Sequence, residues 1–285
     1  MSLSELSKAP SASQARVAAA PQVGPIGPRR IGLVNGRGLW TLYRKEVQRF
    51  LNVFTQTVMA PVVTTLLFLA IFTLALSRQG LGDGFSYAEF LAPGLVVMAI
   101  VQNSFANTSS SMVIAKIQGN IVDVLMPPLS AWELVAGFAA GGLTRGLLVG
   151  TAVTLVMSVF VTLPVVDPLA MIFYAVNASL ALSLLGLLAG IWSEKFDHLA
   201  AVTNFVIMPL SFLSGTFYAL DRLPESWQSV ALVNPFFYMI DGFRYGVIGQ
   251  ADASLLVGAV YLVALNVGLF ALAYRLVDRG WHLKA

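Results

Sequence analysis

Long apolar runs separated by short polar stretches dominate the chain. A helix of about 20 apolar residues matches the ~30 Å thickness of the hydrocarbon core of a bilayer. Six runs reach that length, at 53–76, 90–113, 134–163, 169–192, 199–220 and 255–274. The pattern therefore predicts an all-α polytopic membrane protein with six transmembrane helices.

Residues 38–51, before the first run, show helical spacing with a narrower apolar face. Apolar and aromatic side chains between Trp40 and Leu51 recur at three- and four-residue steps, and the opposite face is basic. This pattern is typical of an amphipathic helix lying in the membrane interface, in contact with anionic lipid. Two interpretations stay open: a simple juxtamembrane anchor, or a lever that contacts a cytoplasmic partner. The basic residues are Arg44, Lys45 and Arg49.

The polar stretch between the second and third runs also carries apolar residues at helical spacing. Its apolar face predicts a short amphipathic helix, which Pro127-Pro128 would end. Such a stripe either packs against the ends of the protein's own spans or enters a groove of a partner. The stripe consists of Ile117, Ile121, Val124 and Leu125.

The segment 221–252 fits neither a loop nor a span. It holds six aromatic residues, more apolar surface than an aqueous loop normally exposes. Pro224 and the Asn234-Pro235 pair interrupt any single long helix, because proline lacks the N–H donor and restrains the residue before it. We therefore expect two short helices that form a re-entrant hairpin, buried in protein or lining a cavity. Asp241 and Arg244, three residues apart, are expected to form an ion pair that fixes the second helix.

Polar side chains within the second and fifth runs are expected to avoid lipid. In the second run they provide either hydrogen bonds between helices or a hydrated path. In the fifth run, Pro209 among polar residues predicts a kink near an internal surface. The polar positions are Asn103, Ser104, Asn107, Thr108 and Ser111 in the second run, and Asn204, Ser211 and Ser214 in the fifth, where they stand among the aromatic residues Phe205, Phe212 and Phe217.

The third run combines closely spaced glycines with one arginine. Glycines four residues apart, at 137/141, 142/146 and 146/150, predict close packing of helices. Arg145 would cost at least ~2.5 kcal/mol well inside hydrocarbon, so it needs a polar partner or a wet cavity. Alternatively, the span begins near Leu143 and Arg145 reaches the cytoplasmic head groups.

Composition and charge support this picture and orient it. Apolar residues make up 57% of the chain and charged residues 11%, and the mean hydropathy of +0.78 places most of the chain in lipid. With six spans, 13 of the 17 basic residues lie on the side of the termini and three on the other side, with Arg145 inside a span. The positive-inside rule then predicts that both termini are cytoplasmic. Residues 1–36 lack an apolar signal core and are expected to form a disordered cytoplasmic tail.

Several kinds of chemistry have no motif in the sequence. The chain contains no G-x-x-x-x-G-K-[ST], no H-E-x-x-H and no cysteine, and its histidines are His198 and His282. The fourteen acidic residues fall almost entirely in loops or at span ends, which disfavours an ion-coupled carrier. We therefore expect no catalytic, cofactor or metal site on this chain, and an energy source on another chain.

Three stretches carry a resemblance to a known family. They are Phe85 to Gly94, Gly141 to Leu147, and the run Asn234-Pro235-Phe236-Phe237-Tyr238-Met239-Ile240-Asp241-Gly242-Phe243-Arg244-Tyr245-Gly246. The chain resembles the permease subunit of a bacterial type-2 ABC exporter over about Trp40 to Gly280. Within that family it is most similar to the multidrug and antibiotic efflux subset. Residues 1–36 have no counterpart in the resemblance.

The resemblance implies a multi-pass permease of the bacterial cytoplasmic (inner) membrane, with residues 37–285 as its transmembrane domain. Two such chains would pair, contact membrane lipid, and bind two separate ATP-binding cassette subunits that carry ATP and Mg, without any role for nucleic acid. The cargo would be amphipathic, drug-like or lipid-linked. A non-transporting scaffold or assembly factor is the main alternative, and an ion-coupled secondary carrier is a weaker one.

The resemblance also assigns roles to residues. The ATPase-coupling interface would be formed by Ile117, Gln118, Asn120, Ile121, Asp123, Val124, Leu125, Arg44, Lys45 and Arg49. The translocation path would be lined by Asn103, Asn107, Asn204, Phe205, Ser211 and Phe212. The outer gate would comprise Trp227, Asn234, Pro235, Phe236, Asp241, Arg244 and Tyr245.

Overall fold

The described part of the chain consists of helices and their connections. The computed structural model describes residue 32 and residues 34–76 and 86–282, and these helices belong to a compact unit that begins at Asn35. The predicted tail 1–36 lies outside the described residues except for its last positions. In order, the helices are α2 (Gly36–Leu51), α3 (Phe54–Leu76), α4 (Tyr87–Ile117), α5 (Ile121–Leu125), α6 (Ala131–Met157), α7 (Pro168–Trp192), α8 (Phe196–Val202), the π-helix η1 (Thr203–Ile207), α9 (Met208–Phe212), the 3-10 turn η2 (Leu220–Arg222), α10 (Glu225–Val233), α11 (Pro235–Ile248) and α12 (Leu255–Asp278).

Five helices of the described residues are long and apolar enough to cross a membrane: α3, α4, α6, α7 and α12. The third predicted run ends earlier than expected, at Met157, and Pro164 disfavours helical backbone in the residue before it. The fifth predicted run, 199–220, corresponds to the shorter apolar segment Phe196–Phe212. The chain leaves the helix there, and Gly215 adopts a left-handed φ of 72° that favours glycine.

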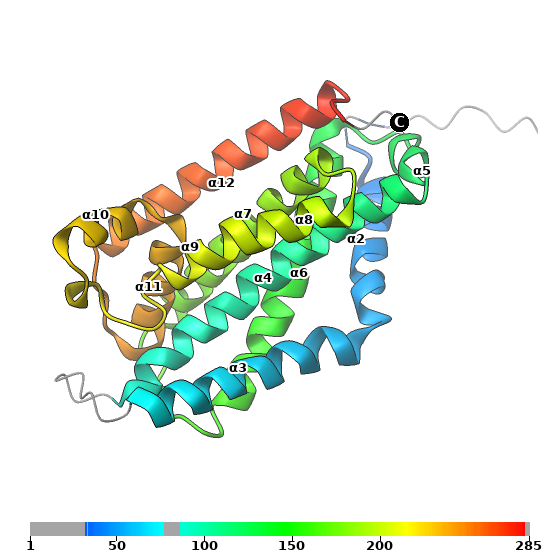
Figure 1. Ribbon diagram of the computed structural model, residues 1–285. Coiled ribbons are helices and arrows are strands. Elements are labelled where there is room, and N and C mark those ends of the chain that lie inside the picture. The colour runs from blue at the N-terminus through cyan, green and yellow to red at the C-terminus, as the bar shows by residue number, and fades with distance from the viewer. Residues whose placement is uncertain (1–31, 33, 77–85, 283–285) are drawn as a thin grey trace, which may run out of the picture. The chain divides into compact units, whose positions relative to one another are not determined.

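Helix α4 forms the centre of the bundle. It packs mainly against α7 and α6 and is buried over most of its length, whereas α3 and α12 expose most of theirs. Figure 1 shows α3 and α12 on opposite sides of α4 and α7. Ser86 caps α4 by accepting a hydrogen bond from the N–H of Glu89, whose side chain accepts one from Ser86 N–H in return.

Glycines on α6 allow this close packing, as predicted. A Cβ atom added at Gly146 would lie 1.9 Å from Ser104 Oγ of α4 and 2.5 Å from Ser179 Oγ of α7. A Cβ atom at Gly150 would lie 2.4 Å from Ile100 Cγ1. The helix surfaces at these positions therefore leave no room for a side chain.

The change Gly146→Ala is accordingly expected to lower stability. Overpacking of this kind costs ~1–3 kcal/mol. The matched control is Gly268→Ala on α12, where nothing lies within 4 Å of the added Cβ. The control should leave the melting temperature of the purified protein unchanged or raise it, because alanine favours a helix over glycine. Equal melting temperatures for the two variants would show that the α4–α6 contact is looser than described.

The segment 221–252 folds into two helices that meet at Asn234-Pro235, as the sequence predicts. Asn234 accepts a hydrogen bond from Phe236 N–H, and Pro235 occupies the first helical position. Helix α11 is almost wholly buried against α7 and α4, whereas α10 buries only Ala231.

Candidate functional site

The polar residues of α4 have three kinds of surroundings. Some contact α7, some contact α2, and the rest border open grooves. Toward α7, Ser104 Oγ lies 2.7 Å from Ser179 Oγ, and the hydroxyl of Thr108 donates to the carbonyl of Ser183 at 2.7 Å. These contacts confirm hydrogen bonding between helices for Ser104 and Thr108.

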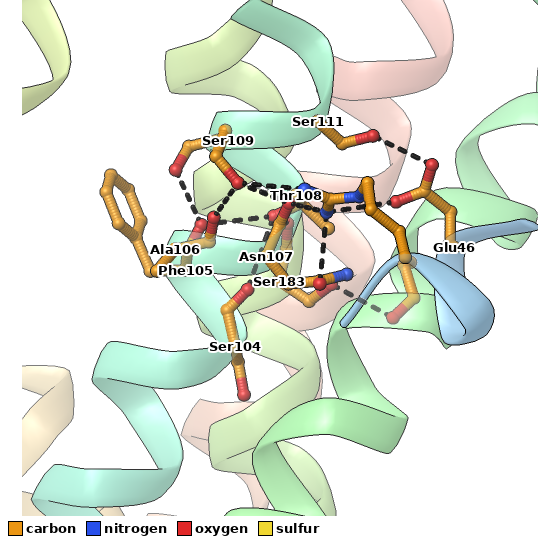
Figure 2. Close-up of polar contacts among 12 residues, drawn as sticks. Glu46, Ser104, Phe105, Ala106, Asn107, Thr108, Ser109, Ser111 and Ser183 are labelled. Carbon is orange, nitrogen blue, oxygen red and sulfur yellow. Dashed lines mark hydrogen bonds and ion pairs between the residues drawn. The ribbon is translucent and has the colours of Figure 1, made fainter. Parts of the chain in front are cut away.

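A second part of the stripe meets a buried carboxylate on α2. Glu46 is fully buried, and its Oε1 accepts a hydrogen bond from Ser111 Oγ at 2.7 Å. Figure 2 shows Glu46 facing Ser111 and Asn107 on α4. A carboxylate at this depth requires hydrogen bonds and a counter-charge, because an unpaired buried charge is strongly unfavourable.

Arg49 supplies that counter-charge and binds α4 at the same time. Its Nη2 lies 3.3 Å from Glu46 Oε2 and donates to the carbonyl and side-chain oxygens of Asn107 at 2.6 and 3.0 Å. Its Nη1 donates to Ser110 Oγ at 3.2 Å. The expectation that Arg49 points toward lipid head groups is therefore wrong, because the side chain turns inward. Arg44 and Lys45 are exposed.

The burial of Glu46 was not predicted from the sequence. Its place three residues before Arg49 on the apolar side of the amphipathic pattern was the available signal, because i, i+3 pairs of opposite charge are neighbours on a helix. We name the five residues Glu46, Arg49, Asn107, Ser110 and Ser111 the α2–α4 cluster.

The open edge of α4 borders two grooves. The first, of about 450 Å³, lies between α3, α4 and α6, and the second, of about 540 Å³, lies between α4 and α8–η1. Gln102 and Asn103 line both grooves. Arg145 borders the first groove, and its Nη2 donates to Asn103 Oδ1 at 3.2 Å. Arg145 thus has a polar partner and also lines a cavity. The sequence alone did not decide which of these two features it would have.

The sequence predicted one amphipathic helix with an apolar stripe over 117–125, but the structure divides this stretch between the end of α4 and the short helix α5. Helix α4 ends at Ile117, and Gly119 turns the chain with a φ of 71° before α5 begins. Ile121 and Val124 pack against α6 and α7, as one interpretation held. The exposed apolar side chains of the turn and α5 are Ile117, Val122, Leu125 and Met126, which we name the α5 surface.

Arg244 of α11 contacts three other segments of the chain: α4, the turn at Gly215 and the connection to α12. The side chain is 2% exposed, and its guanidinium stacks 3.9 Å from the ring centroid of Phe90 on α4. It donates to the carbonyl of Gly215 and lies 4.0 Å from Asp252 Oδ2.

The expected ion pair between Asp241 and Arg244 is wrong, because Asp241 serves another partner. The Asp241 carboxylate accepts hydrogen bonds from the N–H groups of Asp252 at 2.7 Å and Ala253 at 3.1 Å. Burial raises the pKa of Asp241, and these donors and the charge of Arg244 oppose that shift. Asp241 therefore holds the connection to α12, while Arg244 holds the Gly215 turn.

Comparisons with known proteins decide the family. The profile of the ABC-2 type transporter family matches residues 37–248. The chain belongs to this family. It is 38% identical over 248 residues to the Inner membrane transport permease YadH of Escherichia coli (strain K12), covering 87% of this chain and 97% of the relative. It is 26% identical over 201 residues to Nodulation protein J of Rhizobium leguminosarum bv. viciae, covering 67% and 71%. The multidrug subset stays a prediction.

The other path and gate residues predicted for this ABC-2 permease fall into exposed and buried groups. Asn204 and Phe205 lie on the exposed side of η1, and Phe212 is 40% exposed. Ser211 is buried and donates to the carbonyl of Ile207. Among the predicted gate residues Trp227 is exposed, Pro235 and Tyr245 are half-buried, and Asn234, Phe236, Asp241 and Arg244 are buried.

Within residues 34–76 and 86–282, no three acidic or histidine side chains are grouped so that they could hold a metal ion.

Proposed function

We propose that this ABC-2 permease is the membrane-spanning subunit of an ATP-driven exporter. Two copies pair and bind two separate ATP-binding cassette subunits, which carry ATP and Mg and perform the hydrolysis. The absence of a phosphate-binding motif from the sequence supports placing the ATPase on a partner chain.

The observation that carries the proposal is the α5 surface. Ile117 at the end of α4 and Val122 on α5 are each 53% exposed, and Met126 just after α5 is 75% exposed. The buried Ile121 and Val124 fix α5 on α4, α6 and α7, so that a force on the exposed side chains reaches those helices. An apolar surface of this kind suits the groove of a partner. In the exporter, α5 and the adjoining Gln118, Asn120 and Asp123 contact the ATPase, together with Arg44 and Lys45 of α2.

The proposed topology has six spans, with Phe196–Phe212 as the fifth, and both termini cytoplasmic in the inner membrane. The bias of basic residues toward one side supports this orientation. Helices α10 and α11 form a re-entrant hairpin at the outer end, where the exposed α10 is the part free to move as a gate. The translocation path follows the open edge of α4 and the exposed side of η1.

Replacement of the α5 surface tests the coupling. The changes Val122→Glu and Leu125→Glu are expected to reduce the ATPase activity that the permease stimulates in its partner by about tenfold, because they put charge into an apolar contact. The matched control is Val159→Glu, which alters a side chain 78% exposed in the connection after α6. Hydrolysis is measured on the reconstituted complex. Unchanged turnover in both α5 variants would refute the coupling assignment.

Transport itself is tested in vesicles that contain the permease and its ATPase partner. ATP-dependent movement of a fluorescent amphiphile supports the exporter. Movement driven by a proton gradient without the ATPase would identify an ion-coupled carrier instead. A complex that binds the ATPase but moves no amphiphile would favour the scaffold function.

A further inference from the structure

The groove between α3, α4 and α6 contains a charge that the described residues do not neutralise. The salt bridges of residues 34–76 and 86–282 join Arg49 to Glu46 and Arg244 to Asp252, and Arg145 takes part in neither. Its contact with Asn103 is to a neutral amide oxygen, and its buried Nε has no hydrogen-bond partner. Arg145 therefore has donor capacity left for a ligand.

The surroundings do not supply the missing negative charge. Glu46, the buried carboxylate of α2, already pairs with Arg49. Among the residues that the structure describes, no acidic side chain lines the groove. A net positive charge on a membrane-crossing helix is costly unless an anion or water reaches it.

The groove has amide groups beside Arg145 and a mixed lining of apolar side chains and hydroxyl groups toward its other end. Figure 1 shows α3 and α4 running in opposite directions, so that the first residues of α3 lie nearest the later part of α4. The end beside Arg145 holds the amide groups of Gln102 and Asn103, and the opposite end is lined by Leu95 and Phe68 together with Thr64 and Thr65, about one turn from Phe68. Leu95 and Asn103 are eight residues apart on α4, about 12 Å along the helix. The polar lining comprises Gln56, Thr57, Thr64, Thr65, Gln102 and Asn103.

We propose that this groove binds an amphiphile with an anionic head group, a phosphate or a carboxylate. Arg145 is the counter-charge, the side-chain N–H and O–H groups of Gln56, Thr64 and Gln102 donate hydrogen bonds to the head group, and the alkyl chain lies toward Phe68 and Leu95. The inference rests on the proposed function in that it names the chemical class of the cargo. The same chemistry belongs to an anionic lipid of the bilayer, so the experiment must separate the two sources.

Binding of dodecyl phosphate to the full-length chain tests the site without an ATPase. The chain is placed in phosphatidylcholine nanodiscs, and radiolabelled dodecyl phosphate is titrated against it, with empty nanodiscs as the blank. Arg145→Gln is expected to weaken binding about tenfold, the value of a charge-assisted hydrogen bond. Arg145→Lys keeps the charge and should retain most of the affinity. Arg275→Gln removes an exposed cation from α12 and should leave binding unchanged.

Competition experiments on the wild-type chain provide an independent test, which does not require any variant to fold. Dodecanol should compete poorly, because it lacks the charge, and inorganic phosphate should compete poorly, because it lacks the chain. Dodecanol that competes as well as dodecyl phosphate, or Arg145→Gln that binds like the wild type, would overturn the proposal.

Two further measurements identify the source of the amphiphile. Displacement of dodecyl phosphate by phosphatidylglycerol in the nanodisc supports a bilayer lipid at the site. Arg145-dependent, ATP-driven movement of dodecyl phosphate in vesicles supports a cargo. Because binding needs no ATPase, a failure of transport with binding intact would count against the exporter function and leave the site standing.

Discussion

Replacement of Glu46 by alanine should lower the free energy of unfolding by ~3 kcal/mol. Removal of one partner from a buried ion pair costs ~3–5 kcal/mol, and the low end of this range applies because the Arg49 side chain is partly exposed to solvent. The change leaves Ser111 without its acceptor and leaves the guanidinium of Arg49 among neutral groups. Thermal unfolding of the purified protein in detergent measures the loss.

A double-mutant cycle separates the ion pair from the other contacts of Glu46. Arg49→Met removes the cation, and the pair Glu46→Ala/Arg49→Met should be less destabilised than the sum of the single changes. Asp278→Ala, which alters an exposed acid on α12, is the control and should have little effect. Additive losses across the cycle would mean that Glu46 and Arg49 do not stabilise each other.

Replacement of Arg244 by methionine should also cost ~3 kcal/mol, because the change removes a buried cation that contacts α4, the Gly215 turn and Asp252. Arg244→Lys should recover only part of the loss, since an ammonium group can neither stack as a plane on Phe90 nor reach two acceptors in the same geometry. In differential scanning fluorimetry, the melting temperature should fall in the order wild type, Arg244→Lys, Arg244→Met.

Proteolysis distinguishes a local from a global effect at the same site. If Arg244 holds the Gly215 turn, Arg244→Met should expose the connection between α9 and α10 to a protease before the rest of the bundle unfolds. Arg279→Met removes an exposed arginine at the end of α12 and serves as the control. Cleavage at the same rate in both variants would argue against this role.

The apolar pattern predicted the five long helices, because the length of a run and its lack of charge are local properties. The break at Asn234-Pro235 was equally predictable, since proline acts on its own backbone and on its neighbour. The ends at Met157 and Phe212 were not predicted. The apolar runs continue beyond both, although Pro164 follows directly after the third run and Gly215 lies inside the fifth.

The candidate site was harder to predict, because its partners come from distant parts of the chain. The polar stripe of α4 was visible, but nothing local shows that Asn107 faces Arg49 while Ser104 faces Ser179. The position of Glu46 on the apolar side of α2 indicates burial, but nothing local shows that Ser111 of α4 provides its hydrogen bond. The helical spacing of Asp241 and Arg244 suggested a pair with each other, whereas Arg244 lies near Asp252 and Asp241 accepts hydrogen bonds from the backbone.

The length of α4 has a mechanical consequence. Its 31 residues span about 46 Å, well beyond the ~30 Å hydrocarbon thickness, and one helix thereby joins Phe90, on which Arg244 stacks, to Ile117 beside α5. A tilt of about 5° around one end of a rod of that length displaces the other end by ~4 Å. A small tilt of α4 around its Ile117 end would therefore shift its Phe90 end by about the length of a side chain.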